Sequence, residues 1–363
     1  MKERTLSQRL HIDIPLLFGI IVLCGFGLVV LYSAGNQNIE LVYQQAIKLA
    51  IAIFIMILIA QIPPATMARW SIGLHILGIL LLVAVIYYGD IGKGAKRWLD
   101  IGILSFQPSE LMKLSVPLVI AYYLSDKSLP PNILRIVTVF VFIFVPVFLI
   151  AKQPDLGTAL LVAAAGLSVL FVSGISQRLL ASLGVMASAA APFLWYFMHD
   201  YQKRRVLTFL NPESDPLGGG YHIIQSKIAI GSGGLYGKGW LNGTQSHLEF
   251  LPERSTDFIF AVLCEEFGML GVLFLICIYM FIILRCLYIA TQSQHTFGKL
   301  LASGITLTFF VYIFVNMGMV SGQLPVVGVP LPLISHGGTS MVTLMAGFGF
   351  LMAIHTHRSF LSF

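Results

Sequence analysis

The chain has 363 residues, of which 57% are hydrophobic and only 10% are charged, and its mean hydropathy is +0.87. A soluble domain carries about 25% charged residues because its surface must be wetted, so this composition excludes soluble globular and disordered proteins. The net charge of +6 is modest, and the four cysteines stand singly inside apolar runs, which indicates neither a disulfide framework nor a zinc site.

Ten apolar stretches are long enough to cross a bilayer as helices, which takes about 20 residues each. They lie near residues 14–34, 43–62, 70–88, 107–125, 131–151, 157–174, 178–197, 258–290, 299–322 and 332–356. The first stretch follows three basic residues as a signal peptide would, but its apolar core is too long for a cleaved segment. The sequence therefore predicts an all-α polytopic membrane protein with about ten transmembrane helices, forming a single domain over residues 1–363.

Ten spans place both termini on one side of the membrane. With a cytoplasmic N-terminus, the Lys and Arg residues of the connections divide equally, ten inside and ten outside. The positive-inside rule weighs short loops most, and six of the outer charges lie in one long connection. We therefore expect cytoplasmic termini and a large extracytoplasmic loop at 199–256, between the seventh and eighth spans. The basic residues outside suit an anionic ligand.

Three outer connections have unusual compositions. Residues 89–107 hold Lys93, Lys96 and Arg97 around Trp98, and 199–256 contains an apolar run at 221–230 that suggests a short helix on or in the membrane. The third, 322–340, is rich in Gly and Pro and cannot form a regular helix. Irregular backbone near a bilayer is tolerated where it lines a cavity or is buried in protein. We expect the three connections to line an outward-facing cleft.

Acidic residues stand at the predicted outer starts of three spans: Glu110, Asp155 and Asp257. Their Pro, Ser, Thr and Asp neighbours are typical of helix starts, so each has a simple structural explanation. We favour that explanation for Asp155 and weigh it evenly against a functional one for Asp257. Helix N-termini also attract phosphate, so three of them beside basic residues would form a diphosphate pocket in which a carboxylate accepts a proton.

Glu110 and Lys113 are three residues apart and share a helix face. A charged pair inside a span is expensive and usually marks function, which we favour over an ion pair that only fixes packing. Glu265 and Glu266 lie deeper in the eighth span, and the sequence does not distinguish a structural hydrogen bond from a functional role there.

Motifs for nucleotide chemistry are absent from the sequence. The run GSGGLYGKG at 231–239 is not a P-loop, because Ser232 replaces its first glycine and Gly239 follows Lys238. There is no HExxH motif and no Asp-x-Asp pair. The histidines at 199, 222, 247 and 336 lack metal-ligand spacing, and we expect them to be loop residues with satisfied hydrogen bonds. We expect no nucleic-acid partner.

Six long motifs resemble the SEDS family (shape, elongation, division, sporulation). They are KGAKRWLDIG (93–102), QPSELMKL (107–114), QPDLGTALL (153–161), DPLGGGYHIIQSKIAIGSGGLYGKGW (215–240), LPERSTDFIFAVLCEEFG (251–268) and GMVSGQLPVVGVPLPLISHGGTSM (318–341). The match runs essentially end to end and is closer to the elongation members than to the division members.

This resemblance implies a peptidoglycan glycosyltransferase that polymerises lipid II into glycan strands during cell elongation. The transfer would invert the anomeric centre, with undecaprenyl diphosphate as leaving group. The reaction would take place at the outer face of the bacterial cytoplasmic (inner) membrane. The implied partner is a class B penicillin-binding protein acting as transpeptidase, and the chain would also contact membrane lipid.

The resemblance also implies functional residues. Asp257 is the essential aspartate, which we assign as general base. Candidates for the diphosphate clamp are Lys93, Lys96, Arg97 and Arg205, and the remaining cavity residues are Trp98, Glu110, Lys113, Asp155, Gln225, Ser226 and Lys227. A divalent cation (Mg or Mn) could share the work of the clamp, which the sequence leaves open.

Two positions depart from the family pattern. Ser255 stands where the family usually has histidine, and His336 stands where it usually has tyrosine. The first departure puts in doubt any role of an imidazole in tuning the base.

The alternative from another class is a flippase or transporter of a lipid-linked precursor, in which Glu110, Lys113, Glu265 and Glu266 would relay protons. Against it, the polar residues gather on one side rather than at the midplane, and no inverted repeat is visible. A scaffold that only recruits partners would leave the Glu110–Lys113 pair unexplained.

Overall fold

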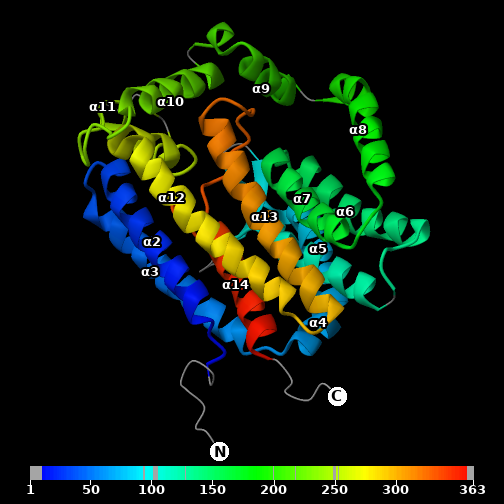
Figure 1. Cartoon of the computed structure of the whole chain (residues 1–363). Helices are drawn as coiled ribbons and strands as arrows, with labels where there is room; N and C mark the ends of the chain where they lie inside the picture. The colour runs from blue at the N-terminus through cyan, green and yellow to red at the C-terminus, as the bar shows by residue number, and fades with distance from the viewer. Residues whose placement is uncertain are drawn as a thin grey trace, which may run out of the picture.

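A computed structural model describes residues 10–92, 95–100, 105–126, 128–198, 200–216, 218–247, 251 and 253–357. The described chain is a bundle of long helices with smaller elements at one end (Figure 1). The start of α2 and the end of α14 lie together at the opposite end of the bundle from these elements (Figure 1). The prediction of an all-α polytopic membrane protein is confirmed.

Ten helices coincide with the ten predicted spans. They are α2 (Ile14–Ala34), α3 (Ile39–Ala60), α4 (Pro64–Tyr88), α5 (Pro108–Ser125), α6 (Ile133–Lys152), α7 (Leu156–Val172), α8 (Gln177–Phe197), α12 (Ile259–Thr291), α13 (Thr296–Val320) and α14 (Thr339–Thr356). Within the described residues, seven of them are long and apolar enough to cross a membrane, and α7 is a shorter apolar helix. Helices α5 and α8 fill the other two predicted positions.

Smaller elements occupy the end away from the termini. The long loop folds into α9 (Asp200–Leu210), the 3-10 helix η1 (Pro212–Ser214), α10 (Gly219–Gly233) and α11 (Thr244–His247). Helix α10 contains the short helix predicted at 221–230. Three short strands form an antiparallel sheet that the sequence did not predict, with β1 (Asp90–Gly92), β2 (Ala95–Asp100) and β3 (Ser105–Phe106) in that order.

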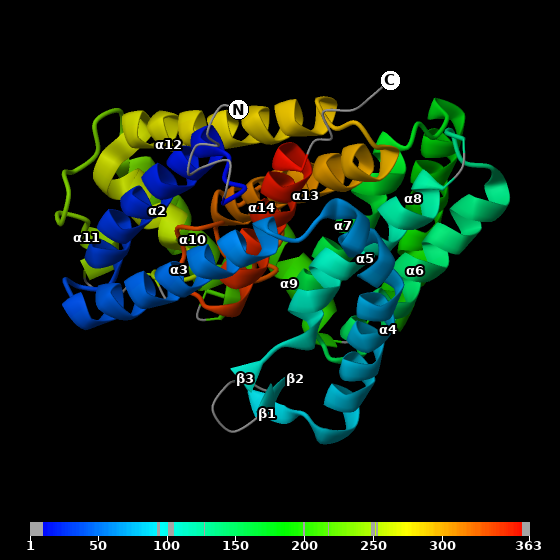
Figure 2. The ribbon, with the colours of Figure 1, turned by 90° about the horizontal axis from the view of Figure 1, so that it is seen from below.

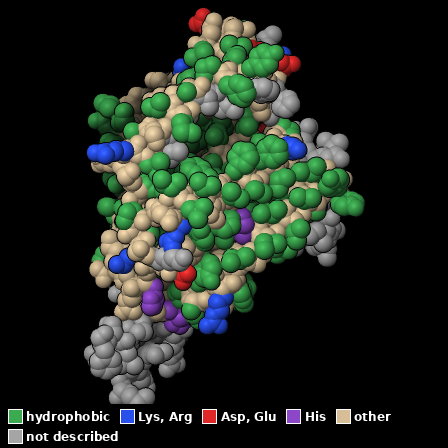
Figure 3. Space-filling model, turned by 90° about the vertical axis from the view of Figure 1, so that its right-hand side faces the viewer, with side chains coloured by type: hydrophobic (Ala, Val, Ile, Leu, Met, Phe, Trp, Pro, Cys, Tyr) green, Lys and Arg blue, Asp and Glu red, His purple; other side chains and the backbone are tan. Residues whose placement is uncertain are grey.

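The helices pack around one apolar core. Helix α2 packs on α12, α3 on α14, and α4 on α5, while α7 is surrounded by α5, α6 and α13. Figure 2 shows α13 and α14 in the middle of the bundle, between the α2–α3 pair and the α4–α7 group. The outer surface is also largely apolar (Figure 3), as a lipid-facing surface must be.

The irregular segment 321–338 is buried inside the bundle at residues 329 and 331–335, while residues 321–328 are half-buried or exposed. Val329, Leu331, Leu333 and Ile334 are each at most 4% exposed. A Cβ atom added to Gly27 of α2 would lie 2.9 Å from the carbonyl oxygen of Leu333, so the segment runs against the backbone of α2. The prediction that these residues are not helical is confirmed, but the last span was predicted to begin at 332, and α14 begins only at Thr339.

Helix α12 is broken at Gly268, whose φ is +61°. The turn at 234–239 supplies backbone hydrogen bonds where the helix has lost its own. Lys238 and Gly239 donate to the carbonyls of Glu265 and Glu266, both at 3.0 Å, and Met269 donates back to Gly234 at 3.0 Å. Side chains added at Gly237 or Gly268 would clash with this pairing.

The same contact explains the two buried glutamates of α12. Glu265 Oε1 accepts hydrogen bonds from Lys238 Nζ at 2.8 Å, Thr244 Oγ1 at 3.1 Å and the backbone N–H of Gln245 at 3.0 Å. Glu266 accepts one from Ser33 of α2. These glutamates therefore fasten the outer loop and α2 to the break in α12.

At the end of the bundle that carries the termini, Asp13 joins α2 to α12. Its Oδ1 accepts from the backbone N–H of Leu16 at 2.9 Å, and Arg285 donates Nε and Nη2 to its two oxygens at 3.0 and 2.7 Å. Burial alone would raise the pKa of Asp13, but the hydrogen bonds from Arg285 and Leu16 hold it below its ordinary value.

We expect Asp13→Ala to lower the stability of the bundle, because Arg285 would lose both acceptors and α2 its cap. Hydrogen bonds to charged groups contribute about 1.5–3 kcal/mol each. Thermal unfolding of the purified protein in detergent should show a lower midpoint, whereas Asp126→Asn, a change at an exposed carboxylate at the end of α5, should leave the midpoint unchanged. Equal midpoints for the two variants would contradict this role.

Candidate active site

Asp257 lies in a series of turns at 253–258 that lead into α12. The N-cap of α12 is Phe258, and it has no side-chain capping bond. Asp257 therefore does not have the helix-capping role that was the structural explanation for its position. Asp257 is half-buried. A Cβ atom added to Gly328 would lie 3.4 Å from Asp257 Oδ2, which places this carboxylate beside the exposed Gly328 of the irregular segment 321–338.

Three consecutive carbonyl groups fix the turn that carries Asp257. The carbonyl of Ser255 accepts from the backbone N–H of His336 at 2.8 Å, and that of Thr256 accepts from Ser335 Oγ at 2.6 Å. The carbonyl of Asp257 accepts from Asn316 Nδ2 at 2.9 Å. The two departures from the family pattern, at 255 and 336, therefore meet in one backbone hydrogen bond.

Three successive residues of the irregular segment 321–338, Val326 to Gly328, face three parts of the site. Val326 lines a cavity that also contains Arg205. The carbonyl oxygen of Val327 lies against Gly157, at the start of α7, so closely that a Cβ atom there would clash with it. Gly328 lies beside the carboxylate of Asp257. The segment thus connects the predicted base with two regions that carry arginine.

The first of these regions joins β2 to the starts of α5 and α7. Arg97 Nη2 donates to the carbonyl of Pro154 at 2.6 Å, and its Nε lies 4.0 Å from Asp155 Oδ2. Gln107 Nε2 donates to the same carboxylate oxygen at 3.0 Å, while Asp155 Oδ1 accepts from the backbone N–H of Thr158 at 3.2 Å. The capping role expected for Asp155 is confirmed, and the outer starts of α5 and α7 do meet.

The second region is a cavity of about 460 Å³ between α9, the start of α10 and Val326. Its charged lining residues are Asp200, Arg204, Arg205 and Asp215. Arg204 and Arg205 are both exposed on α9, so they can approach an anion from the outer side. Arg204 was not among the predicted site residues.

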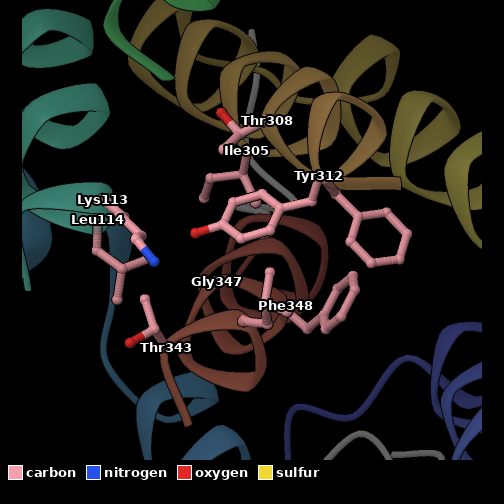
Figure 4. Close-up of a pocket in the computed structure, with 10 residues that line it drawn as sticks. Lys113, Leu114, Ile305, Thr308, Tyr312, Thr343, Gly347 and Phe348 are labelled. Atoms are coloured by element: carbon pink, nitrogen blue, oxygen red, sulfur yellow. The ribbon is translucent and has the colours of Figure 1, made fainter. Parts of the chain in front are cut away.

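The charged pair of α5 lies inside the bundle. Lys113 Nζ is 2.6 Å from Glu110 Oε1, and the two residues are only 6% and 5% exposed. The ammonium also lies 5.2 Å from the centre of the Tyr312 ring of α13. Figure 4 shows Lys113 and Tyr312 pointing toward one another beside a cavity of about 30 Å³, room for about one water molecule.

One face of α13 links this pair to the base. Thr308, Tyr312 and Asn316 recur every four residues and so lie one above another along the helix. Tyr312 contacts Lys113, and Asn316 contacts Asp257. The Glu110–Lys113 pair therefore lies about one helical turn deeper in the bundle than the turn of Asp257.

The three predicted site residues of α10 differ in their exposure and in their contacts. Ser226 is fully buried and donates to the carbonyl of Val320 at 2.8 Å, so it joins α10 to the end of α13 and does not line the cleft. Its assignment as a substrate-binding residue stays a prediction, and the structure gives it a packing contact, which the sequence could not show because burial depends on the packing partner. Lys227 is exposed, with its stem over Gly322, and Gln225 is half-buried.

The remaining predicted residues lie in the sheet. Trp98 is half-buried in β2 and is paired with Asp90 of β1. Lys93 lies outside the described residues, and of Lys96 only the backbone in β2 is described. Their roles in a diphosphate clamp stay predictions.

His222 of α10 is a neighbour of the base that sequence reasoning missed. Its ring stacks on Phe258, with centroids 5.6 Å apart. Its buried Nδ1 has no hydrogen-bond partner among the described residues, so the expectation of a satisfied histidine is wrong for this nitrogen. Burial lowers the pKa of His222, and the nearby Glu253 carboxylate opposes that shift. The signal in the sequence that could have identified His222 was its position directly after Tyr221, within a long family motif.

No group of three or more His, Cys, Asp or Glu side chains in the described parts of the chain is arranged to hold a metal ion. Asp155 and Glu110 are instead engaged with Gln107 and Lys113. A divalent cation that shares the work of the clamp stays a prediction.

The chain is similar to known proteins over nearly its whole length. The family profile described as "Cell cycle protein" (FTSW, RODA, SPOVE) matches residues 9–360. The peptidoglycan glycosyltransferase MrdB of Escherichia coli is 54% identical over 361 residues, which cover 99% of this chain and 98% of that protein. The MrdB protein of Helicobacter pylori is 37% identical and covers 94% of this chain and 89% of its own.

Solved structures show the same fold. One, described as "Structural coordination of polymerization and crosslinking by a peptidoglycan synthase complex", has a TM-score of 0.82 at 33% identity and covers 94% of this chain and 97% of its own. The rod shape determining protein RodA of Thermus thermophilus has a TM-score of 0.72 at 27% identity and covers 96% of this chain and 98% of its own.

Variants of the Glu110–Lys113 pair separate its contribution to folding from any other role. Glu110→Leu should lower the stability strongly, by about 3–5 kcal/mol, because it leaves a buried ammonium without its carboxylate. The double variant Glu110→Leu with Lys113→Met should recover most of that loss, since no unpaired charge remains. Thermal unfolding in detergent measures both, and a double variant as unstable as the single one would contradict the pairing.

Proposed function

The chain belongs to the FtsW, RodA and SpoVE family of cell cycle proteins, and from that premise we propose that Asp257 is the general base of its glycosyl transfer. The chain is a multi-pass membrane protein and a peptidoglycan glycosyltransferase. The observation that carries the proposal is the position of Asp257. It is half-buried beside Gly328, in a turn fixed by three carbonyl hydrogen bonds, and it does not cap α12.

The proposed substrate is lipid II, which carries its disaccharide on undecaprenyl diphosphate. The carboxylate of Asp257 takes the proton of the acceptor's sugar hydroxyl as that oxygen attacks the anomeric carbon of the donor. The bond from this carbon to the diphosphate oxygen breaks, and the anomeric centre is inverted. Undecaprenyl diphosphate leaves with the electron pair, and fixed positive groups in a site of low dielectric stabilise its growing charge.

The arginine regions on either side of Asp257 are the proposed diphosphate clamp. Arg205, with Arg204, lines the cavity at Val326, and Arg97 is held at the start of α7 beside Val327. Arginine suits this task because its planar guanidinium binds phosphate in a bidentate manner. Lys93 and Lys96 are part of the proposed clamp because they are close to Arg97 in the sequence.

An apolar groove supports a polyprenyl-linked substrate. It has a volume of about 520 Å³, lies between α12 and α13, and is lined by residues including Phe260, Tyr279 and Phe314. Phe260 follows Asp257 by three residues, so the groove begins close to the proposed base. A lipid tail could lie there while its diphosphate reaches the arginines.

The proposed reaction takes place at the outer face of the cytoplasmic (inner) membrane, with both termini in the cytoplasm. The start of α2 and the end of α14 lie at the opposite end of the bundle from the start of α12, which supports this orientation (Figure 1). The proposed partner is a class B penicillin-binding protein that crosslinks the strands. Its support is the likeness to a peptidoglycan synthase complex in which polymerisation and crosslinking are coordinated.

The transporter alternative is less well supported. Its proton relay needed Glu265 and Glu266, and these carboxylates fasten the outer loop and α2 to the break in α12.

Asp257→Asn should abolish polymerisation. A general base contributes about 10²–10⁴-fold to the rate, and an amide cannot take the proton. The measurement is polymer formation from labelled lipid II in detergent, where flipping does not register, with the transpeptidase partner present. Asp126→Asn is the matched control at the other end of the bundle, and thermal unfolding checks that both variants are folded.

Full polymer formation by folded Asp257→Asn would remove Asp257 as the base. Absence of polymer from every preparation, wild type included, would favour the transporter.

Arg205→Gln should raise the KM for lipid II about tenfold, since one charge-assisted hydrogen bond of about 1.5–3 kcal/mol is lost. Arg178→Gln, at an exposed residue at the start of α8, should leave KM unchanged. Steady-state kinetics over a range of lipid II concentrations measures both. An unchanged KM for Arg205→Gln would exclude this arginine from the clamp.

A further inference from the structure

Asn316 is a fully buried amide on α13 whose two donors go to two different segments. Its Nδ2 donates to the carbonyl of Asp257 at 2.9 Å and to the carbonyl of Val329 at 2.7 Å. Both partners are acceptors, so the amide must present its NH₂ group to them. One side chain therefore joins the turn before α12 to the buried Val329 of the irregular segment 321–338.

The two carbonyls that Asn316 binds lie next to the contact between the carboxylate of Asp257 and Gly328. Asp257 carries the carboxylate, and Val329 follows Gly328, against which that carboxylate lies. A single NH₂ group bonded to both carbonyls fixes the distance between the two segments, since its two N–H bonds have a rigid angle. Gly328 has a φ of +75°, so a turn specific to glycine stands where the carboxylate comes close.

The cost of this arrangement argues against a role in stability alone. Asn316 Oδ1 is buried and has no hydrogen-bond partner among the described residues. An unpaired buried acceptor costs about 1–3 kcal/mol, which offsets much of what the two hydrogen bonds contribute. The net contribution of Asn316 to stability is therefore small, and its remaining effect is to orient the two segments that it joins.

We propose that Asn316 is a positioning residue for Asp257, holding the carboxylate at a fixed distance from the segment 326–329. This proposal rests on the proposed role of Asp257 as general base. Asn316 does not touch the reacting atoms and acts only through the two backbone carbonyls. Ser335 and His336 hold the preceding two carbonyls, so Asn316 is the member of the set that acts on Asp257 itself.

The test compares Asn316→Leu and Asn316→Gln with Thr306→Val, all in the full chain with its transpeptidase partner. Leucine keeps the approximate volume but donates nothing, and glutamine keeps the NH₂ group one methylene too far. Thr306 is the matched control, because it is also buried on α13, and its hydroxyl donates to Ala302 within the same helix at 2.7 Å.

Asn316→Leu should lower kcat about 100-fold, the loss typical of a misplacement of about 1 Å, with KM for lipid II within about twofold of wild type. Asn316→Gln should recover part of that loss, and Thr306→Val should match wild type. Hydrogen–deuterium exchange should rise in 253–258 and in 325–331 for Asn316→Leu and in neither segment for Thr306→Val.

The outcomes separate this proposal from the role of Asp257. If Asp257→Asn is inactive while Asn316→Leu keeps full kcat, positioning by Asn316 is wrong and the base assignment stands. If kcat falls and KM rises together with a lower unfolding midpoint, Asn316 is only structural, and the proposal is overturned. Active, folded Asp257→Asn would overturn both.

Discussion

An apolar bundle offers no water to irregular backbone, so each non-helical segment inside it must find its hydrogen bonds within the protein. In this chain the irregular segments satisfy one another. The turn at 234–239 bonds to the broken turn of α12 at Gly268, and the turn at 255–257 bonds to Asn316, Ser335 and His336. The rest of the site depends on this constraint, because the proposed base lies on one of these segments and its nearest neighbours on another.

The same constraint gives the site its rigidity. The segment 321–338 is tied to α12 by the Tyr279 hydroxyl, which donates to the carbonyl of Pro332 at 2.8 Å. It is tied to α3 by Gln45, whose Nε2 donates to the carbonyl of Ser335 at 3.2 Å. A segment with so many fixed carbonyls cannot move freely. A carboxylate that lies against it has a defined position before any substrate arrives, which is the preorganisation that electrostatic catalysis needs.

Buried charged residues in the bundle also find their partners within the protein. Glu110 and Lys113 neutralise one another beneath Tyr312, and Glu265 is neutralised by Lys238. The arginines near Asp257 are only partly engaged: Arg97 remains 31% exposed in its side chain, and Arg204 and Arg205 are exposed. These two buried ion pairs are neutral overall, and the arginines accessible to an anionic substrate stand at the end of the bundle that carries the sheet and α9. Such a division suits an enzyme that binds a diphosphate at the membrane surface better than a carrier that moves it through the midplane.

The sequence by itself determined the span positions, the class of protein and the Glu110–Lys113 pair, because a bilayer makes apolar length and intramembrane charge direct signals. It also marked Asp257 and Asp155 as residues at helix starts, and it predicted that 322–340 would not be regular helix. Only the tertiary structure distinguished the roles of the two aspartates, because capping depends on the direction in which the carboxylate points. The carboxylate of Asp155 turns back to its own helix, whereas that of Asp257 lies beside Gly328. Asn316, His222 and the burial of Ser226 were equally out of reach, because a lone polar residue in an apolar run has no period or spacing to show which distant carbonyl or ring it meets.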